Sequence, residues 1–284
     1  VVDLNSTNPL GWSNHKRPKF NSHLDSIIYE THIRDFTIDD NSGVEKHIKG
    51  KFRGFHKDTH NFKNEVKTGI NHLKELGVNV IQLLPVFDYK TVDEMKYDED
   101  DYNWGYDPLN YNVPEGSYST DPYNGKVRIR EFKELIMNLH ESGFKVVMDV
   151  VFNHTADTED SNFNKIIPNY YYRQSNDGGF SNGSGCGNEL ASERAMVRKF
   201  ILDSVKYWVM EYKIDGFRFD LMGLHDIETM EEVRLALDDD ILIYGEGWKA
   251  DESPINNSKL TLNKEYLLYI QERRYLEVKK TNME

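Results

Sequence analysis

The sequence predicts an α/β fold in which the strands of a parallel sheet alternate with helices. Short apolar runs and amphipathic helical stretches follow one another along most of the chain, which is the order expected of βα units. The run FKVVMDVVF at 144–152 is almost continuously apolar, as expected of a strand covered on both faces. The length of 284 residues allows one α/β barrel of about 250 residues or two smaller domains.

Five strands and four helices follow from the hydrophobic pattern. We expect strands at 26–33, 78–85, 144–152, 214–221 and 241–244, and helices at 64–76, 130–141, 192–212 and 226–237. The polar stretch at 88–124 is expected to form a long loop. Five strands would also suit an open doubly wound sheet, but no GxGxxG phosphate-binding turn follows the first strand.

The first 25 residues are polar and contain Pro9, Gly11 and Pro18, so we expect a linker or the remnant of a preceding domain. They contain no apolar core of a signal peptide, and no run in the chain approaches the ~20 apolar residues of a membrane-spanning helix. Because the chain begins with Val1 rather than Met, we expect a processed or cut N-terminus.

Charge and composition narrow the classes of partner. Acidic side chains outnumber basic ones by 48 to 35, which gives a formal net charge of −13. Nucleic acid and anionic membranes repel such a surface, so a neutral partner is favoured. The chain has a single cysteine, Cys186, so it forms no intrachain disulfide, and we interpret this thiol as an ordinary loop residue.

Polar side chains occur where the fourth predicted strand ends. Arg218 and Asp220 lie two residues apart, so they share one face of the strand. A guanidinium beside a carboxylate favours the charged form and lowers the carboxyl pKa, which suits a nucleophile. The alternative is a purely structural Arg–Asp pair.

The end of the fifth predicted strand carries a second carboxylate. Gly245 and Gly247 flank Glu246, and glycines allow close approach of backbone or ligand. Beside Trp248, Glu246 is a candidate general acid. An exposed Glu in a simple turn is the alternative.

The third predicted strand ends in Asp149, Asn153 and His154. An Asp inside an apolar run needs a partner, because an unpaired buried carboxylate is costly. His154 comes after the strand and is either structural or catalytic.

Two carboxylates on neighbouring strands are the apparatus of glycoside hydrolysis, and retaining enzymes hold them about 5–5.5 Å apart. The segment YNWGYDP at 102–108 gathers rings and amides that suit sugar binding. A rigid aromatic loop beneath the fold is the alternative.

Three of these motifs together resemble conserved regions of the α-amylase superfamily of glycoside hydrolases. DVVFNH at 149–154, GFRFDL at 216–221 and GEGW at 245–248 match the first three regions in the family's order and at compatible spacing. The resemblance implies a (β/α)8 TIM barrel, of which about the first five βα units are present.

Three further segments resemble type I pullulanases, the α-1,6 debranching enzymes of that superfamily. YNWGYDP at 102–108 is similar to their signature, and YETHIRDF at 29–36 and NGSGCGNELASER at 182–194 also fit. The resemblance covers most of the chain, from about Leu4 to Trp248.

The resemblance implies a role for each matching residue. Asp220 matches the catalytic nucleophile, Arg218 the arginine that orients and ionises it, and Glu246 the acid/base. His154 matches a histidine that contacts the sugar, and Tyr106 the aromatic residue that stacks beneath it.

Four more residues complete the expected substrate site. Asp149 and Asn153 match structural positions of the family, and Trp104 and Trp248 are aromatic residues expected to bind substrate. The family's asparagine is a calcium ligand in some amylases, so calcium stays open at this position, but we assign no metal or other cofactor here.

The family's fourth region, which ends in a sugar-binding Asp, has no counterpart in this sequence. Only residues 249–284 follow Trp248, and they contain no histidine. We therefore expect a C-terminally truncated chain, with a partial catalytic barrel at 26–248. We expect the divergent tail at 249–284 to be helical around 263–280.

Three functions remain open. The first is hydrolysis of α-1,6-glucosidic bonds in pullulan, starch or glycogen, impaired by the truncation. The second is a catalytically silent fragment that binds glucan, and the third is another superfamily hydrolase of the neopullulanase or isoamylase type. The expected partner is an α-glucan, with no nucleic acid and no membrane, and exposed barrel edges would allow self-association.

Overall fold

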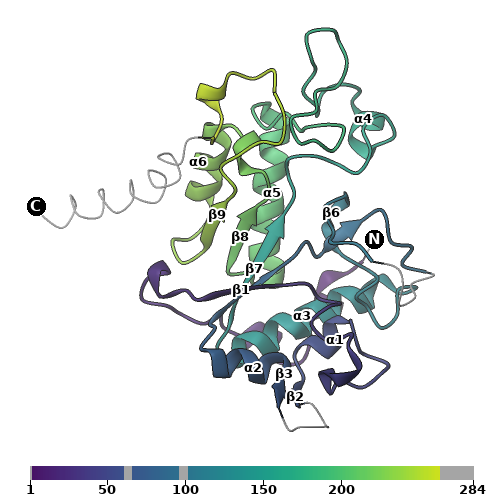
Figure 1. Cartoon of the computed structure of the whole chain (residues 1–284), viewed down its shortest axis with the longest axis vertical. Coiled ribbons are helices and arrows are strands. Elements are labelled where there is room, and N and C mark those ends of the chain that lie inside the picture. The colour runs from purple at the N-terminus through teal and green to yellow at the C-terminus, as the bar shows by residue number, and fades with distance from the viewer. Residues whose placement is uncertain (1, 61–65, 96–101, 263–284) are drawn as a thin grey trace, which may run out of the picture. The chain divides into compact units, whose positions relative to one another are not determined.

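The computed structural model describes residues 2–60, 66–95 and 102–262. The described chain divides into two compact units (Figure 1). The first unit contains residues 2–149, 207–217 and 240–242, and the second contains residues 150–206, 218–239 and 243–262. The helix expected at 263–280 lies outside the described residues.

All five predicted strands are present, and they form one sheet. In chain order they are β1 (Ile28–Thr31), β4 (Val80–Leu83), β7 (Lys145–Val150), β8 (Gly216–Phe219) and β9 (Leu242–Gly245), and the sheet order is the same. β4 pairs in parallel with β1 on one side and with β7 on the other. All six residues of β7 are buried, as their apolar run predicts. A parallel sheet in chain order is the arrangement of a (β/α)8 barrel, here with five of its strands.

The first unit has a core of large rings between its helices. Its helices are α1 (Phe52–Phe55), α2 (Gly69–Leu76), α3 (Gly125–Glu141) and the last turn of α5 (Ala195–Tyr212). Phe132 of α3 contacts Phe52 and Trp208, with ring centroids 5.0 and 6.0 Å apart. These rings are buried, so α1, α3 and α5 are held together mainly by apolar contact.

Two short antiparallel pairs in the first unit depart from the expected elements. β2 (Asp58–His60) pairs with β3 (Lys67–Thr68), which delays the start of α2 to Gly69. β5 (Phe87–Tyr89) pairs with β6 (Pro108–Pro114), so the stretch 88–124 is not simply a loop. The β5–β6 register shifts at two places, and such irregular pairing leaves little period-2 signal in a sequence.

The N-terminal segment packs within the first unit. The buried Lys133 ammonium donates hydrogen bonds to Leu4 O (3.3 Å), Thr7 Oγ1 (3.2 Å) and Asn8 Oδ1 (2.6 Å), and it pairs with Glu211. These acceptors surround a charge that would be costly to bury alone. The origin of residues 1–25 as a linker or a domain remnant stays a prediction.

A chain of three polar side chains also joins this segment to the core. His15 Nε2 lies 2.7 Å from His140 Nδ1, and His140 Nε2 lies 2.7 Å from Asp215 Oδ2. Asp215 Oδ2 accepts a second bond from the amide of Val146 (2.8 Å), at the start of β7. These three side chains, His15, His140 and Asp215, form a hydrogen-bonded relay. The relay fixes the N-terminal segment to the point where β7 and β8 begin.

The second unit packs its helices around a smaller aromatic cluster. It contains α4 (Asn162–Ile166), most of α5, and α6 (Ile227–Ala236). Phe152 lies between Phe200 and Phe219, with centroids 6.5 and 6.0 Å away. Arg198 of α5 pairs with Asp226 at the start of α6, and it also pairs with Glu228 and Glu232. Among the described residues, no helix is both long and apolar enough to cross a membrane.

Candidate active site

The end of β8 holds Arg218 and Asp220 on one face, as their spacing predicts. Arg218 Nη1 donates to Asp220 Oδ1 at 2.9 Å, and both side chains are mostly buried. Phe217 and Phe219 point the other way and are completely buried. The apolar face therefore anchors the strand, while its other face presents the ion pair.

The pKa of Asp220 differs from the expected direction. Burial raises it above the usual value for an aspartate, and the nearby charge of Glu246 adds to the rise. Hydrogen bonds from Asn153 and Arg218 act in the opposite direction but do not outweigh the burial. The expectation of a lowered pKa was wrong, because the sequence shows the arginine but not how deeply the carboxylate is buried.

Glu246 is held at the same guanidinium. Arg218 Nη2 lies 2.5 Å from Glu246 Oε1, and the backbone N–H of Leu221 donates to Glu246 Oε2 at 3.0 Å. Leu221 has φ of +39° and ψ of +47°, a left-handed conformation that a leucine rarely adopts. This turn directs the Leu221 N–H towards Glu246, and no sequence motif signals a backbone donor of this kind.

Gly245 allows this close arrangement. A Cβ at Gly245 would lie 2.6 Å from Phe219 O and 2.8 Å from Met222 Cβ, closer than real side chains approach. The next amide, that of Glu246, donates to Phe219 O at 3.1 Å. The glycine before Glu246 is thus required by the backbone of β8, as the flanking glycines suggested.

Asn153, which follows β7, contacts the Arg218–Asp220 ion pair through Asp220. Its Nδ2 group donates to the carbonyl oxygen of Asp220 at 2.9 Å and to Asp220 Oδ2 at 2.8 Å. His154 Nδ1 lies 2.6 Å from Asn153 Oδ1. The second unit therefore brings together five of the predicted site residues, namely Asn153, His154, Arg218, Asp220 and Glu246.

Trp248, also in the second unit, is 52% exposed. Its backbone carbonyl would overlap a Cβ at Gly223, so it packs closely against the turn after β8. Its ring is open to solvent, so a sugar could stack on it.

The other predicted site residues lie in the first unit. Tyr106 donates its hydroxyl hydrogen to Asp149 Oδ2 at 2.7 Å, and Asp149 is completely buried, so its expected partner exists. Gly105 has φ of +90° and lies against Pro85, which fixes the loop before Tyr106.

Trp104 is 59% exposed, and its Nε1 donates to the hydroxyl of Tyr102 (2.7 Å). Tyr102 in turn donates to Asp35 Oδ2 (2.7 Å), a contact that the sequence did not indicate.

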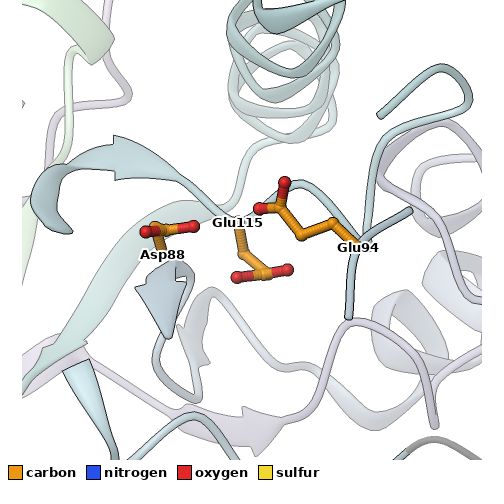
Figure 2. Close-up of side chains that lie close together, drawn as sticks. All are labelled: Asp88, Glu94 and Glu115. Atoms are coloured by element: carbon orange, nitrogen blue, oxygen red, sulfur yellow. The ribbon is translucent and has the colours of Figure 1, made fainter. Parts of the chain in front are cut away.

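A cluster of three carboxyl groups in the first unit has the donor atoms for a metal ion. Figure 2 shows Asp88 of β5, Glu94 and Glu115 gathered at one place, and their oxygens all lie within 4.8 Å of one another. Arg128 of α3 enters the same cluster, with Nη1 2.7 Å from Glu94 Oε1 and 3.8 Å from Asp88 Oδ1. Both oxygens of Glu115 accept backbone N–H groups, from Tyr89 and Ser117.

The negative charge of the three carboxyl groups is reduced by protonation and by the Arg128 guanidinium. Burial raises the pKa of Asp88 to about 7 and that of Glu115 to about 8, so both carboxyl groups begin to take up protons already near neutral pH. Arg128 compensates much of the remaining negative charge. The donor set therefore suits a protonated ion-pair network better than a calcium site. The side-chain oxygen of Asn153, a calcium ligand in some relatives of this family, lies 2.6 Å from His154 Nδ1.

Comparisons with known proteins agree with this geometry. A family model described as the α-amylase catalytic domain matches residues 64–177. The pullulanase of Bacillus subtilis is 46% identical over 242 residues, covering 84% of this chain and 33% of that protein. The chain belongs to the α-amylase superfamily.

Solved structures of the superfamily extend the likeness to the fold. The pullulanase of Paenibacillus barengoltzii, solved with maltohexaose and α-cyclodextrin, is 50% identical with a TM-score of 0.90, over 94% of this chain and 42% of that one. The predicted fold class is thereby confirmed as part of a (β/α)8 barrel. A rice isoamylase 3 is 34% identical and covers 79% of this chain. The chain spans about a third of the length of the curated relatives named here.

Proposed function

We propose that this chain carries the two carboxylates of a retaining glycoside hydrolase that cleaves α-1,6-glucosidic bonds in pullulan, starch or glycogen. One observation carries the proposal, namely the Arg218 guanidinium that contacts both Asp220 (2.9 Å) and Glu246 (2.5 Å). A shared guanidinium holds the two carboxylates close together, as the retaining mechanism requires.

In the first step, the protonated carboxyl of Glu246 gives its proton to the glycosidic oxygen. The bond between that oxygen and the anomeric carbon breaks as a carboxylate oxygen of Asp220 bonds to the carbon. In the second step, Glu246 takes a proton from water, and the water oxygen displaces Asp220 from the anomeric carbon. Two inversions at that carbon leave its configuration unchanged.

The comparisons support the choice of substrate class. The relatives at 46% and 50% identity are pullulanases, and the solved one holds maltohexaose, an α-glucan oligosaccharide. The isoamylase is less similar, at 34% identity, which favours the pullulanase type over the isoamylase type. The net charge of −13 also suits a neutral glucan.

A silent glucan-binding chain is the second candidate. Two exposed aromatic rings favour it, those of Trp104 (59% exposed) and Trp248 (52% exposed), because such rings can stack on sugar faces without any hydrolysis.

We also propose that the sheet edges are where further strands, or a second copy of the chain, would add. β1 and β9 are the end strands of the sheet. Ile28 and Tyr29 on β1 are exposed, which is unusual for the apolar residues of a barrel strand.

The test is the release of reducing sugar from pullulan by the whole chain, compared with Asp220→Asn. Maltotriose formed by the native chain and lost in the variant would support hydrolysis of α-1,6 bonds. Products from α-1,4 cleavage would instead indicate a neopullulanase. Slowed migration in a glucan-containing gel, without any product, would leave only the binding role.

A further inference from the structure

The side chain of Asn153 lies between the proposed nucleophile and a histidine. Asn153 follows β7 and is only 2% exposed, so the sugar does not reach it in this conformation. Its Nδ2 group makes two hydrogen bonds to Asp220, to the carbonyl oxygen (2.9 Å) and to Oδ2 (2.8 Å). A single amide thus holds both the backbone and the carboxylate of one residue.

The orientation of this amide is set by the chemistry of its neighbours. The backbone carbonyl oxygen of Asp220 only accepts hydrogen bonds, and so does its carboxylate when ionised, so the NH2 group of Asn153 must face them. The opposite orientation would bring Asn153 Oδ1 against two acceptor oxygens in a buried place, which is costly.

Asn153 Oδ1 must therefore face His154 Nδ1, which lies 2.6 Å away. An amide oxygen only accepts, so Nδ1 of His154 carries a hydrogen, which in a neutral ring fixes the Nδ1–H tautomer.

The two oxygens of the Asp220 carboxylate have different partners. Arg218 Nη1 binds Oδ1 at 2.9 Å, and Asn153 Nδ2 binds Oδ2 at 2.8 Å. With both oxygens held, the carboxylate has a fixed orientation at the end of β8. These hydrogen bonds also oppose the rise in the pKa of Asp220 that burial causes.

We propose that Asn153 is a positioning residue that holds Asp220 in its reactive orientation and sets the tautomer of His154. This inference rests on the proposed function only in so far as it takes Asp220 as the nucleophile. It gives a specific task to the structural position that its motif suggested, one that differs from the calcium ligation seen in some amylases.

The test uses Asn153→Asp and Asn153→Ala in the whole chain, with Asn138→Asp on α3 as the matched control. Asn153→Asp replaces the donor by a second carboxylate, while Asn153→Ala removes the donor without adding charge. We expect both variants to raise the pKa of Asp220, with the larger shift in Asn153→Asp. The measurement is the carboxyl carbon resonance of Asp220 as a function of pH.

Turnover gives a second measurement that a merely structural residue would not move in this way. We expect kcat on pullulan to fall about 10- to 100-fold in Asn153→Ala while KM changes little, because orientation rather than binding is lost. The acid limb of the kcat/KM profile should move to higher pH along with the titration of Asp220. Asn138→Asp should match the native chain in both.

The nitrogen resonances of His154 in the native chain separate this inference from the proposed function and from misfolding. They should show the proton on Nδ1 whether or not the chain hydrolyses pullulan, and whether or not the variants fold. A proton on Nε2, or an Asp220 titration unchanged by both substitutions, would overturn the role of Asn153. A correct tautomer and a shifted titration without turnover would refute the hydrolase alone.

Discussion

The backbone N–H of Leu221 donates to Oε2 of Glu246 at 3.0 Å, although the two residues are 25 positions apart in the sequence. Leu221 directly follows Asp220, so the turn that ends β8 also positions the carboxylate that follows β9. The left-handed φ of +39° at Leu221 is the backbone strain associated with this contact.

Substituting Arg218→Lys should reduce kcat on pullulan by about 100-fold, because an ammonium is a point charge and does not bridge two carboxylates as a guanidinium does. Arg17→Lys is the control, since Arg17 pairs with Asp240 in a more exposed setting. Initial rates of reducing-sugar release measure the effect. Equal rates in the two variants would refute the bridging role.

Gly245→Ala should lower the free energy of unfolding by about 1–3 kcal/mol, because the new methyl group overlaps Phe219 O and Met222. Gly125→Ala is the matched control, because nothing lies within 4 Å of a Cβ there. At the start of α3 the control should be neutral or slightly stabilising. Urea unfolding of both variants measures the difference, and a neutral Gly245→Ala would contradict the close contact.

The relay of His15, His140 and Asp215 should make stability depend on pH. Partial burial lowers the pKa of His15 from 6.5 to about 4, with further lowering from His140 and Lys213 and an opposing effect of Asp215. The unfolded chain then binds a proton at higher pH than the folded chain does. Stability from His15 is therefore full above pH 6.5 and is lost as the pH falls towards 4.

The loss should amount to about 1–2 kcal/mol, because the ring is partly exposed and solvent screens its charge. Unfolding free energies at pH 7 and pH 4.5 measure it in the native chain and in His15→Gln. The variant should lose less stability than the native chain over this range, and an exposed-site control, His47→Gln, should behave like the native chain. Parallel curves for all three proteins would exclude a contribution from His15.

Arg128→Met should destabilise the first unit by about 3–5 kcal/mol at pH 8, because three carboxyl groups lose their internal cation. The loss should be smaller at pH 5. There the raised pKa values of Asp88 (about 7) and Glu115 (about 8) keep both groups protonated. Arg130→Met, on the same helix but exposed, is the control.

Millimolar Ca²⁺ should partly restore the stability of Arg128→Met at pH 8 and leave the native chain unchanged. Thermal unfolding with and without a chelator measures this. A chelator that destabilises the native chain would show that the cluster binds a metal despite Arg128.

Local sequence patterns predicted the strands in which burial is constant or alternates regularly from residue to residue. The run at 144–152 gave β7, because a strand buried on both faces is apolar at every position. The period of two placed Arg218 and Asp220 together, because it depends only on strand geometry. The motifs before and after these strands supplied the remaining members of the second unit's site.

Other features depend on the packed structure and leave no local signal. The pairing of β5 with β6 is irregular, so no alternation marks it in 88–124. The pKa of Asp220 depends on burial by segments distant in the sequence, and its direction was therefore wrong. The hydrogen bond from Leu221 to Glu246 comes from a backbone group, which every residue type except proline carries.

Lys133 limits how this protein can be shortened for study. A recombinant version that began at β1 would lose Leu4, Thr7 and Asn8, which provide three of the four acceptors around the Lys133 ammonium. The charge would then remain in the first unit with the Glu211 carboxylate as the acceptor that is left. A boundary drawn at the first strand would therefore remove part of what stabilises α3, and expression designs should keep the chain from Asp3 onwards.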